Sequence, residues 1–420
     1  MYLTDEEKGI LQGEQGHVAQ KCMEFLIAYG EAAGAERLVE IDGTADIHPG
    51  VPSWVPEYEI TEQEVEELAR KGEKFKVPTF ANKPVRPGQV VDGWENCGCY
   101  FSSNPEHHHK FIQSLRPYIK MGMIPILSCN YYLVSSYWPT AGQHCSWGES
   151  SAIPWANAIL GARTNFDGCF QTAYLGKAPA YDMHLDENRV ATVLVESEFE
   201  LRNDMEYDLF GWAVGEAVGL QVPTIVGIGK PNLSQLVKMN STLNTGGQVR
   251  MYHIPGVTPE ASTLEAAFKG NKNFQKIIIT RDELKRIYDL INYASDDNVD
   301  FVYLGCPHYN IVEVQKAARI LEGKRCKTPL WIMTNSWTYR LAEMMGYKDI
   351  IERAGGTFMS GTCAAELKEI PPTAVMATDA AKQNYYITGH FHPKKLQAWY
   401  GTIEDCIEAA ITGKWKGEWR

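Results

Sequence analysis

Short apolar runs alternate with segments of helical periodicity through the second half of this chain, and that alternation limits its fold more than any other feature. Runs such as 223–228, 276–280 and 329–333 have the length of buried strands, and helix-like stretches separate them. Parallel strands need crossover connections of about a dozen residues or more, which are usually helices. The sequence therefore predicts right-handed β-α-β units and an α/β fold of mostly parallel sheets flanked by helices.

The same patterns place individual elements. Helices are predicted over 4–33, 61–71 and 105–121, and Thr4 with Glu7 has the spacing of a capping box at the start of the first. A chain of 420 residues with 44% hydrophobic residues can bury a large core, so we expect two to three lobes around a central cleft. The full set of predicted strands is 123–127, 190–195, 223–228, 248–253, 276–280, 301–304, 329–333 and 355–359.

Composition excludes several classes of protein. The formal net charge of -12 argues against a nucleic-acid-binding protein, because phosphate binding needs clustered Lys and Arg. No apolar run approaches the ~20 residues of a membrane span. The 10 cysteines are too dispersed for a disulfide scaffold and the N-terminus is acidic rather than signal-like, so we expect a reducing, cytoplasmic setting.

Three cysteines lie at sharp turns among small residues: Cys129, Cys306 and Cys363. The first two directly follow predicted strands, and ligands of open α/β sheets collect at the carboxyl ends of strands. An iron–sulfur cubane held by three thiolates keeps one iron without a protein ligand, and that iron can act as a Lewis acid on a substrate hydroxyl. Four thiolates would instead suggest electron transfer.

The densest polar region covers 143–151, 157–165 and 184–189. Arg163 offers a planar fork suited to a carboxylate, and neighbouring hydroxyl and amide groups can donate to its oxygens. The region therefore predicts a site for a small oxyacid. The candidate substrate contacts are Ser150, Ser151, Arg163, Thr164, Asn165 and His184.

Each of these residues also has a structural interpretation. Ser150 and Ser151 could cap a helix over 152–160, and capping is compatible with binding. Arg163 could form an ion pair with Asp167 or Asp186. His184 could be a buried histidine with satisfied hydrogen bonds.

The motifs in this region, together with others along the chain, resemble the large, catalytic subunit of aconitase X, and the resemblance covers nearly all of the sequence. The N-terminal segments that carry it are Tyr2–Glu7, Gly13–Gly16 and Gly34–Val39. The strongest block is Glu149–Ala152 with Ala156, Asn157, Gly161–Asn165 and His184–Arg189. The remaining segments are Val77–Thr79, Gly256–Ala261, Gly305–His308, Gly361–Cys363 and Thr378–Tyr386.

This resemblance implies a hydro-lyase in which an iron–sulfur cluster on Cys129, Cys306 and Cys363 polarises a hydroxyl so that water is eliminated. A 4Fe-4S cluster is expected, with 3Fe-4S and 2Fe-2S as alternatives because clusters in the family vary. The substrates associated with the family are small hydroxy acids, cis-3-hydroxy-L-proline and mevalonate 5-phosphate.

The resemblance also implies a partner. Elimination needs a base for the carbon-bound proton, and in the aconitase family a serine on a small swivelling domain has that role. Residues 1–420 resemble the catalytic region alone, so the swivelling domain is expected on a separate small subunit in a heterodimer. The catalytic base of this chain is accordingly left unassigned, and the isolated chain should be nearly inactive.

Other interpretations stay open. The loops 45–54 and 92–96 depart from the family pattern, which fits either a different substrate or a non-catalytic interaction subunit that keeps the scaffold. A zinc-dependent lyase could use the same three thiolates. Cys97, Cys99, Cys145 and Cys169 form a second candidate thiol group, and Lys83, Arg86 or Lys230 could serve a phosphorylated substrate.

Overall fold

The computed structural model describes residues 1–49, 55–82, 105–165, 168–361, 374–390 and 396–419. Cys97, Cys99, Cys363, Asp167, Lys83 and Arg86 lie outside these ranges. The helices are α1 (Asp5–Leu11), α2 (His17–Ala32), α3 (Glu62–Lys71), α4 (Pro105–Lys120), α5 (Ala152–Pro154), α6 (Phe170–Leu175), α7 (Asp204–Val218), α8 (Leu233–Gly247), α9 (Leu264–Ala267), α10 (Arg281–Ile291), α11 (Ile311–Leu321), α12 (Ser336–Met344), α13 (Tyr347–Arg353), α14 (Ala381–Tyr385) and α15 (Ile403–Thr412), with π-helical turns η5 (Trp155–Leu160) and η9 (Tyr386–His390).

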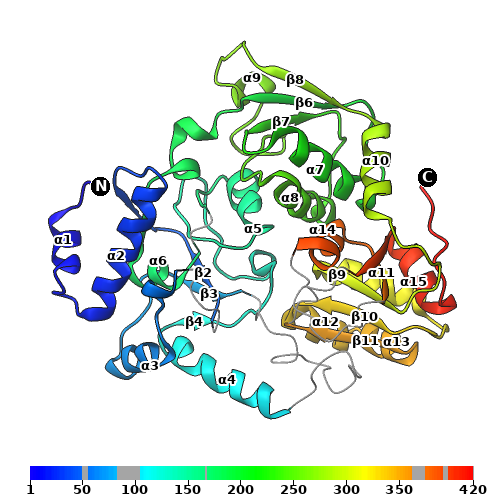
Figure 1. The fold of residues 1–420 in the computed structure, drawn as a ribbon, viewed down its shortest axis with the longest axis horizontal. Coiled ribbons are helices and arrows are strands. Elements are labelled where there is room, and N and C mark those ends of the chain that lie inside the picture. Colours follow the sequence, from blue (N-terminus) through cyan, green and yellow to red (C-terminus); the bar gives the residue numbers. More distant parts are fainter. Residues whose placement is uncertain (50–54, 83–104, 166–167, 362–373, 391–395, 420) are drawn as a thin grey trace.

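The strands form three parallel sheets and one antiparallel pair (Figure 1). The five-stranded sheet has the order β11-β10-β9-β12-β13 and is parallel throughout. The sheets β2-β3-β4 and β7-β6-β8 are also parallel, and β1 pairs antiparallel with β5. The bounds are β1 (Leu38–Glu40), β2 (Ala45–Ile47), β3 (Thr79–Ala81), β4 (Met123–Ile124), β5 (Lys177–Pro179), β6 (Val193–Ser197), β7 (Pro223–Val226), β8 (Gln275–Ile279), β9 (Phe301–Tyr309), β10 (Leu330–Thr334), β11 (Gly356–Ser360), β12 (Val375–Thr378) and β13 (Gln397–Tyr400).

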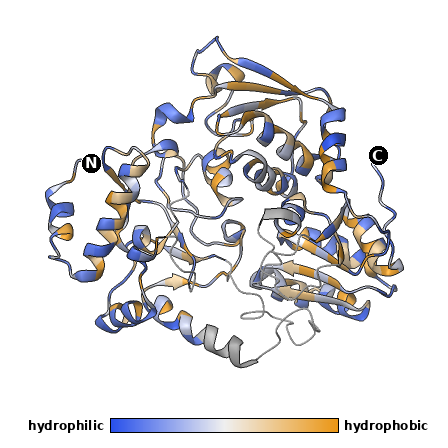
Figure 2. Cartoon of the chain, in the orientation of Figure 1, coloured by the Kyte–Doolittle hydropathy of each residue, from blue (hydrophilic) through white to orange (hydrophobic). Residues whose placement is uncertain are grey.

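The five-stranded sheet is buried on both faces, which explains why its strands are continuous apolar runs rather than alternating ones. Val302, Leu304 and Ile332 point into a core closed by α11, α13 and α15. Tyr303 and Trp331 point into a second buried cluster on the opposite face. In Figure 2 the hydrophobic colour follows the strands, whereas the outer helix α3 is largely hydrophilic. Among the described residues, no helix is both long and apolar enough to cross a membrane.

The predicted α/β fold is confirmed, and three local predictions are wrong. The helix predicted over 4–33 has the expected Thr4 capping box but breaks into α1 and α2, because Gly13 and Gly16 adopt positive φ. The strand predicted over 123–127 ends at Ile124, and Leu127 has a φ of 54° that a strand cannot contain. The run 248–253 is not a strand, since His253 makes only an isolated bridge to Thr224.

Strand β9 continues beyond the predicted 301–304 after an irregularity that positions Cys306. Its pairing with β10 changes register between Leu304 opposite Ile332 and Tyr309 opposite Thr334. Several residues of β9 therefore lie opposite one residue of β10, and the extra residues bulge from the ladder. Gly305 begins this bulge with a φ of 99°. A side chain there would overlap the carbonyl oxygen of Met333.

Substituting Gly305 by alanine should therefore reduce the free energy of unfolding by about 2–4 kcal/mol, through backbone strain and steric overlap. Gly323→Ala is a matched control, because Gly323 has a φ of 72° but no atom within 4 Å of the place that a Cβ would occupy. Strain alone should cost that control about 1 kcal/mol. Denaturant unfolding of both variants checks this, and equal losses would show that the close approach to Met333 is unimportant.

Candidate metal centre and active site

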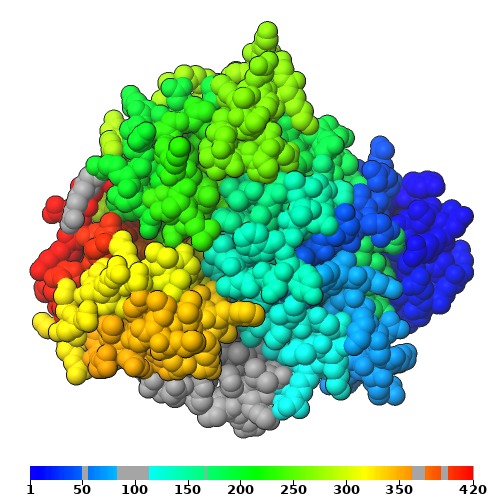
Figure 3. Space-filling view, turned by 180° about the vertical axis from the view of Figure 1, so that it is seen from behind, coloured from blue at the N-terminus to red at the C-terminus, as the bar shows by residue number. Residues whose placement is uncertain are grey.

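The loops that carry Cys129 and Cys306 lie against each other. The backbone N–H of His308 donates to the Cys129 Sγ at 3.4 Å, and the Asn130 side chain donates to the carbonyl of His308. The Ser128 hydroxyl also contacts the His308 Nδ1 at 3.0 Å. On the face shown in Figure 3, the cyan and teal part of the surface lies against the yellow and orange part. Residues far apart in sequence thus form one buried site.

These two thiols fit a sulfur-ligated metal group. Cys129 and Cys306 are 6% and 7% exposed, and a peptide N–H directed at a sulfur favours its thiolate form. Thiolates select zinc or iron–sulfur clusters, whereas magnesium and calcium prefer oxygen ligands. The third predicted ligand, Cys363, lies outside the described residues, and the described part of the chain contains no group of three His, Cys, Asp or Glu residues able to hold a metal ion. The three-thiolate ligand set stays a prediction.

A buried ion pair forms the wall beside Cys129. The Lys382 ammonium donates to the Glu149 Oε1 at 2.9 Å and to the Ser150 hydroxyl at 2.6 Å. Both charged side chains are almost fully buried, with 2% and 5% exposed. The next residue, Ser151, donates to the backbone carbonyl of Cys129 at 3.4 Å. This wall therefore joins the first part of the chain to α14 directly next to the candidate metal site.

A buried polar network fixes the segment that carries Lys382. Lys238 on α8 donates to the Asp379 carboxylate at 2.9 Å, and the Tyr309 hydroxyl donates to the same carboxylate at 2.7 Å. Asp208 on α7 accepts from the Ala381 N–H at 2.8 Å. Burial raises the pKa of Asp208 to about 6, although the Lys238 charge opposes this shift. The turn between β12 and α14 is thus held from two helices of the middle lobe.

Asp46 and Asn82 close the opposite side at the carboxyl ends of β2 and β3. Asp46 is fully buried and accepts from the Gly148 N–H at 2.8 Å and from the Asn82 amide at 3.3 Å. The Asn82 amide also contacts the His48 Nε2 at 3.2 Å. Polar side chains from the strand ends of two different sheets therefore surround the same region, as expected for parallel α/β folds.

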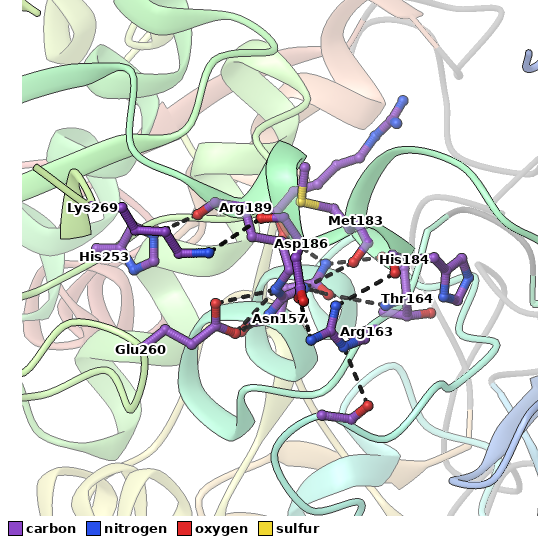
Figure 4. A network of polar contacts seen from close by, with 12 residues as sticks. Asn157, Arg163, Thr164, Met183, His184, Asp186, Arg189, His253, Glu260 and Lys269 are labelled. Carbon is purple, nitrogen blue, oxygen red and sulfur yellow. Dashed lines mark hydrogen bonds and ion pairs between the residues drawn. The ribbon is translucent and has the colours of Figure 1, made fainter. Parts of the chain in front are cut away.

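The predicted contacts Arg163 and His184 belong to a neighbouring network (Figure 4). Arg163 forms an ion pair with Asp186 and donates to the Gly142 carbonyl at 3.2 Å, which is one of the two structural pairings the sequence suggested. Nearby, the buried Arg189 is bound to Glu260 and to the carbonyls of Asn157 and Met183. His184 is buried with its Nδ1 2.8 Å from the Nδ1 of His144.

Thr164 and Asn165 are also engaged internally. The Thr164 hydroxyl accepts from the Trp147 N–H at 2.8 Å. The Asn165 amide donates to the Tyr181 carbonyl at 2.9 Å and its oxygen accepts from the Met183 N–H at 3.1 Å. Neither serine acts as a side-chain cap on the described helix, since Ser151 precedes α5 without a capping hydrogen bond. Ser150 and Ser151 thus lie between the Lys382–Glu149 ion pair and Cys129. Substrate contact by the six candidate residues named from the sequence stays a prediction.

The partly buried His144 should make folding sensitive to acid. Burial, followed by the nearby His184 and Arg163 charges, lowers the pKa of His144 from 6.5 to about 4. Between these values the unfolded chain binds a proton that the folded chain does not, so the free energy of unfolding falls as the pH drops from 6.5 toward 4. The stability that depends on a neutral His144 is fully present above about pH 7. Because the ring is only half-buried, its size should be on the order of 1 kcal/mol.

Denaturant unfolding at about pH 7.5 and about pH 5, on either side of the ordinary histidine pKa, measures this effect. His144→Gln retains a hydrogen-bonding side chain but cannot titrate, so it should lose less stability on acidification than the unmodified protein. Identical losses in the two proteins would contradict the assignment.

The sequence did not single out Lys382, Tyr132 or Asp46 for a role. Lys382 offered a weak signal, because it lies inside the segment Thr378–Tyr386 that resembles the family. Asp46 lies in a loop that departs from the family pattern. Glu149 appeared in a motif but received no function.

Comparison with known proteins identifies the family of this chain. The chain matches the aconitase X first domain over residues 1–187, the second domain over 191–289 and the third domain over 299–412. The crystal structure of Thermococcus kodakaraensis aconitase X in its holo-form superposes with a TM-score of 0.77 and 31% sequence identity, covering 98% of this chain and 100% of that one.

Two of the proteins that are similar to this chain over most of its length are enzymes. The phosphomevalonate dehydratase large subunit of Methanocaldococcus jannaschii is 31% identical over an alignment of 420 positions that covers 97% of this chain and 100% of that protein. The cis-3-hydroxy-L-proline dehydratase of Pseudomonas aeruginosa is 30% identical over an alignment of 425 positions that covers 97% of this chain and 70% of that protein. The matches run through all three domains, and this chain belongs to the aconitase X family.

Proposed function

We propose that this chain is the large subunit of an iron–sulfur hydro-lyase that removes water from a small hydroxy acid. The observation that carries the proposal is the contact between the buried Cys129 turn and the part of β9 that contains Cys306, in which the His308 N–H is directed at the Cys129 sulfur. Its relatives in the family are dehydratases, which supports the same reaction class.

The proposed ligands are Cys129, Cys306 and Cys363, for a 4Fe-4S cluster or one of the smaller alternatives. Once bound, such a cluster supplies an iron without a protein ligand that polarises the substrate hydroxyl. The protein's own groups prepare the site. The His308 N–H stabilises the Cys129 thiolate. The stacked rings of Tyr132, Trp147 and Trp155 exclude water from the Cys129 side.

A second chain should supply the base that removes the carbon-bound proton. No described group has been assigned that task, and the Methanocaldococcus jannaschii relative is itself a large subunit by name. We therefore propose a small swivelling-domain subunit that closes over the metal site. The cysteines in the described part of the chain form no disulfide bond with one another, which is compatible with the reducing, cytoplasmic setting that we propose.

The candidate substrates are cis-3-hydroxy-L-proline and mevalonate 5-phosphate, the two chemistries represented among the relatives. The test is anaerobic co-expression with a candidate small subunit, followed by metal analysis and an assay of water elimination from each acid. Turnover of either acid together with bound iron and sulfide is the expected result. An intact cluster with no turnover would favour the non-catalytic interaction subunit, and zinc in place of iron would favour the zinc lyase.

A further inference from the structure

We propose that Lys382 and the hydroxyl of Tyr132 form the subsite that binds the carboxylate of the hydroxy acid. This inference rests on the proposed function and adds the residues that recognise the substrate. It replaces Arg163 as the main carboxylate-binding group, since Arg163 lies in a neighbouring network with Asp186 and Gly142, whereas Lys382 binds Ser150, whose neighbour Ser151 contacts the Cys129 carbonyl.

The burial of Lys382 needs an explanation beyond folding. Removing an ammonium and a carboxylate from water costs several kcal/mol per ion, which their mutual attraction often fails to recover. Lys382 and Glu149 are nonetheless buried together at 2.9 Å. Buried charged groups next to a reaction centre commonly serve the reaction. Here Glu149 lies two positions before Ser151, which contacts the carbonyl of Cys129.

Tyr132 adds an independent observation. Its side chain is 1% exposed and stacks on Trp147 and Trp155. Its hydroxyl is buried and has no hydrogen-bond partner among the described residues. A buried donor without an acceptor costs roughly 1–3 kcal/mol, so such a group is usually reserved for a ligand.

Packing places this hydroxyl in the same region. The Tyr132 ring stacks on Trp147 and Trp155, which flank in sequence the segment that carries Glu149 and Ser151. Burial is the main reason that the pKa of Tyr132 is raised, whereas the nearby Ser151 hydroxyl, which also donates to the Cys129 carbonyl, and the Lys382 charge lower it in part. The phenol therefore lies beside the segment that joins the buried ion pair to Cys129.

This combination suits a carboxylate better than a phosphate. Lys382 already shares its charge with Glu149, so the pair has no net positive charge to offer and suits a ligand with few negative charges. A phosphate monoester carries about -1.5 to -2 charges at neutral pH and is usually bound by several cationic or N–H groups. An ammonium and a phenol O–H can instead donate to the two oxygens of one carboxylate.

Binding, rather than activity, tests the subsite. The anaerobically purified complex with its small subunit is titrated calorimetrically with cis-3-hydroxy-L-proline, with mevalonate 5-phosphate, and with the primary carboxamide of each. Removing a charge-assisted hydrogen bond of this type weakens binding by roughly tenfold to a hundredfold. The unmodified complex should therefore bind at least one acid about tenfold or more tightly than its carboxamide.

The decisive variant combines Lys382→Met with Glu149→Gln, because removing the lysine alone would leave a buried carboxylate unpaired. The double variant should lose the preference for the acid over the carboxamide while keeping its iron content. Tyr132→Phe should weaken acid binding roughly threefold to tenfold. Lys177→Met combined with Glu7→Gln is the matched control, since Lys177 is also buried and paired with the buried Glu7 on a different part of the chain.

An ordinary structural ion pair would leave the acid preference intact in the double variant, and this result would overturn the proposal. Equal binding of acid and carboxamide by the unmodified complex would overturn it as well. Failure of the proposed function looks different: the complex would keep the acid preference and its dependence on Lys382 but eliminate no water from either acid.

Discussion

Replacing Cys306 with alanine should remove most of the bound iron and reduce water elimination by more than about a thousandfold. The reason is that a cluster with only three protein ligands cannot lose one and keep the same metal geometry. Iron and acid-labile sulfide per chain, measured after anaerobic purification, give the first readout. The rate of the complex on its hydroxy acid gives the second.

Cys22→Ala is the matched control, because Cys22 is a fully buried thiol on α2 whose pKa is raised mainly by burial. It should keep its iron and its rate and lose only a little stability through the small cavity. A Cys306→Ala protein that retained a full complement of iron and sulfide would exclude Cys306 as a ligand. The same pair of measurements applies to Cys129.

Adding the small subunit should raise the turnover of this chain by about a hundredfold or more, the second large effect. General acid–base catalysis contributes about 10²–10⁴-fold, and the base for the carbon-bound proton is expected on the partner. Turnover is measured with the holo chain alone and with increasing amounts of the partner. The rate should rise until the two chains are equimolar.

The appropriate control is a partner in which the candidate serine base is changed to alanine. It should still bind this chain, as measured by size-exclusion chromatography, yet fail to raise the rate. Full turnover by the isolated holo chain would show that the base lies within these 420 residues.

Much of the fold could be predicted because parallel strands buried on both faces appear as plain apolar runs. The runs at 276–280 and 329–333 became β8 and β10 almost unchanged. Predictions failed where single residues decide the backbone. Gly13 and Gly16 interrupt a pattern that is otherwise helical, and Leu127 adopts a conformation that its residue type does not indicate.

The candidate site was only partly predictable for a different reason. Turn-borne cysteines after strands can be recognised one at a time, but the contact between the His308 N–H and the Cys129 sulfur joins the turn after β4 to strand β9 of a different sheet, and the sequence does not show how two sheets pack. The pairing of long polar side chains cannot be read in this way. Arg163 forms an ion pair with Asp186 rather than with another nearby acid. Lys382 pairs with Glu149, which is far away in the sequence, because of how the lobes pack.

The central claim is that Cys129 and Cys306, with Cys363, hold an iron–sulfur cluster with one open iron. Anomalous diffraction at the iron absorption edge, on crystals of the anaerobically prepared complex, tests it most directly. We expect one iron cluster bonded to the sulfur atoms of these three cysteines and to no fourth protein ligand. An iron peak elsewhere, a fourth protein ligand, or zinc at these thiols would contradict the claim.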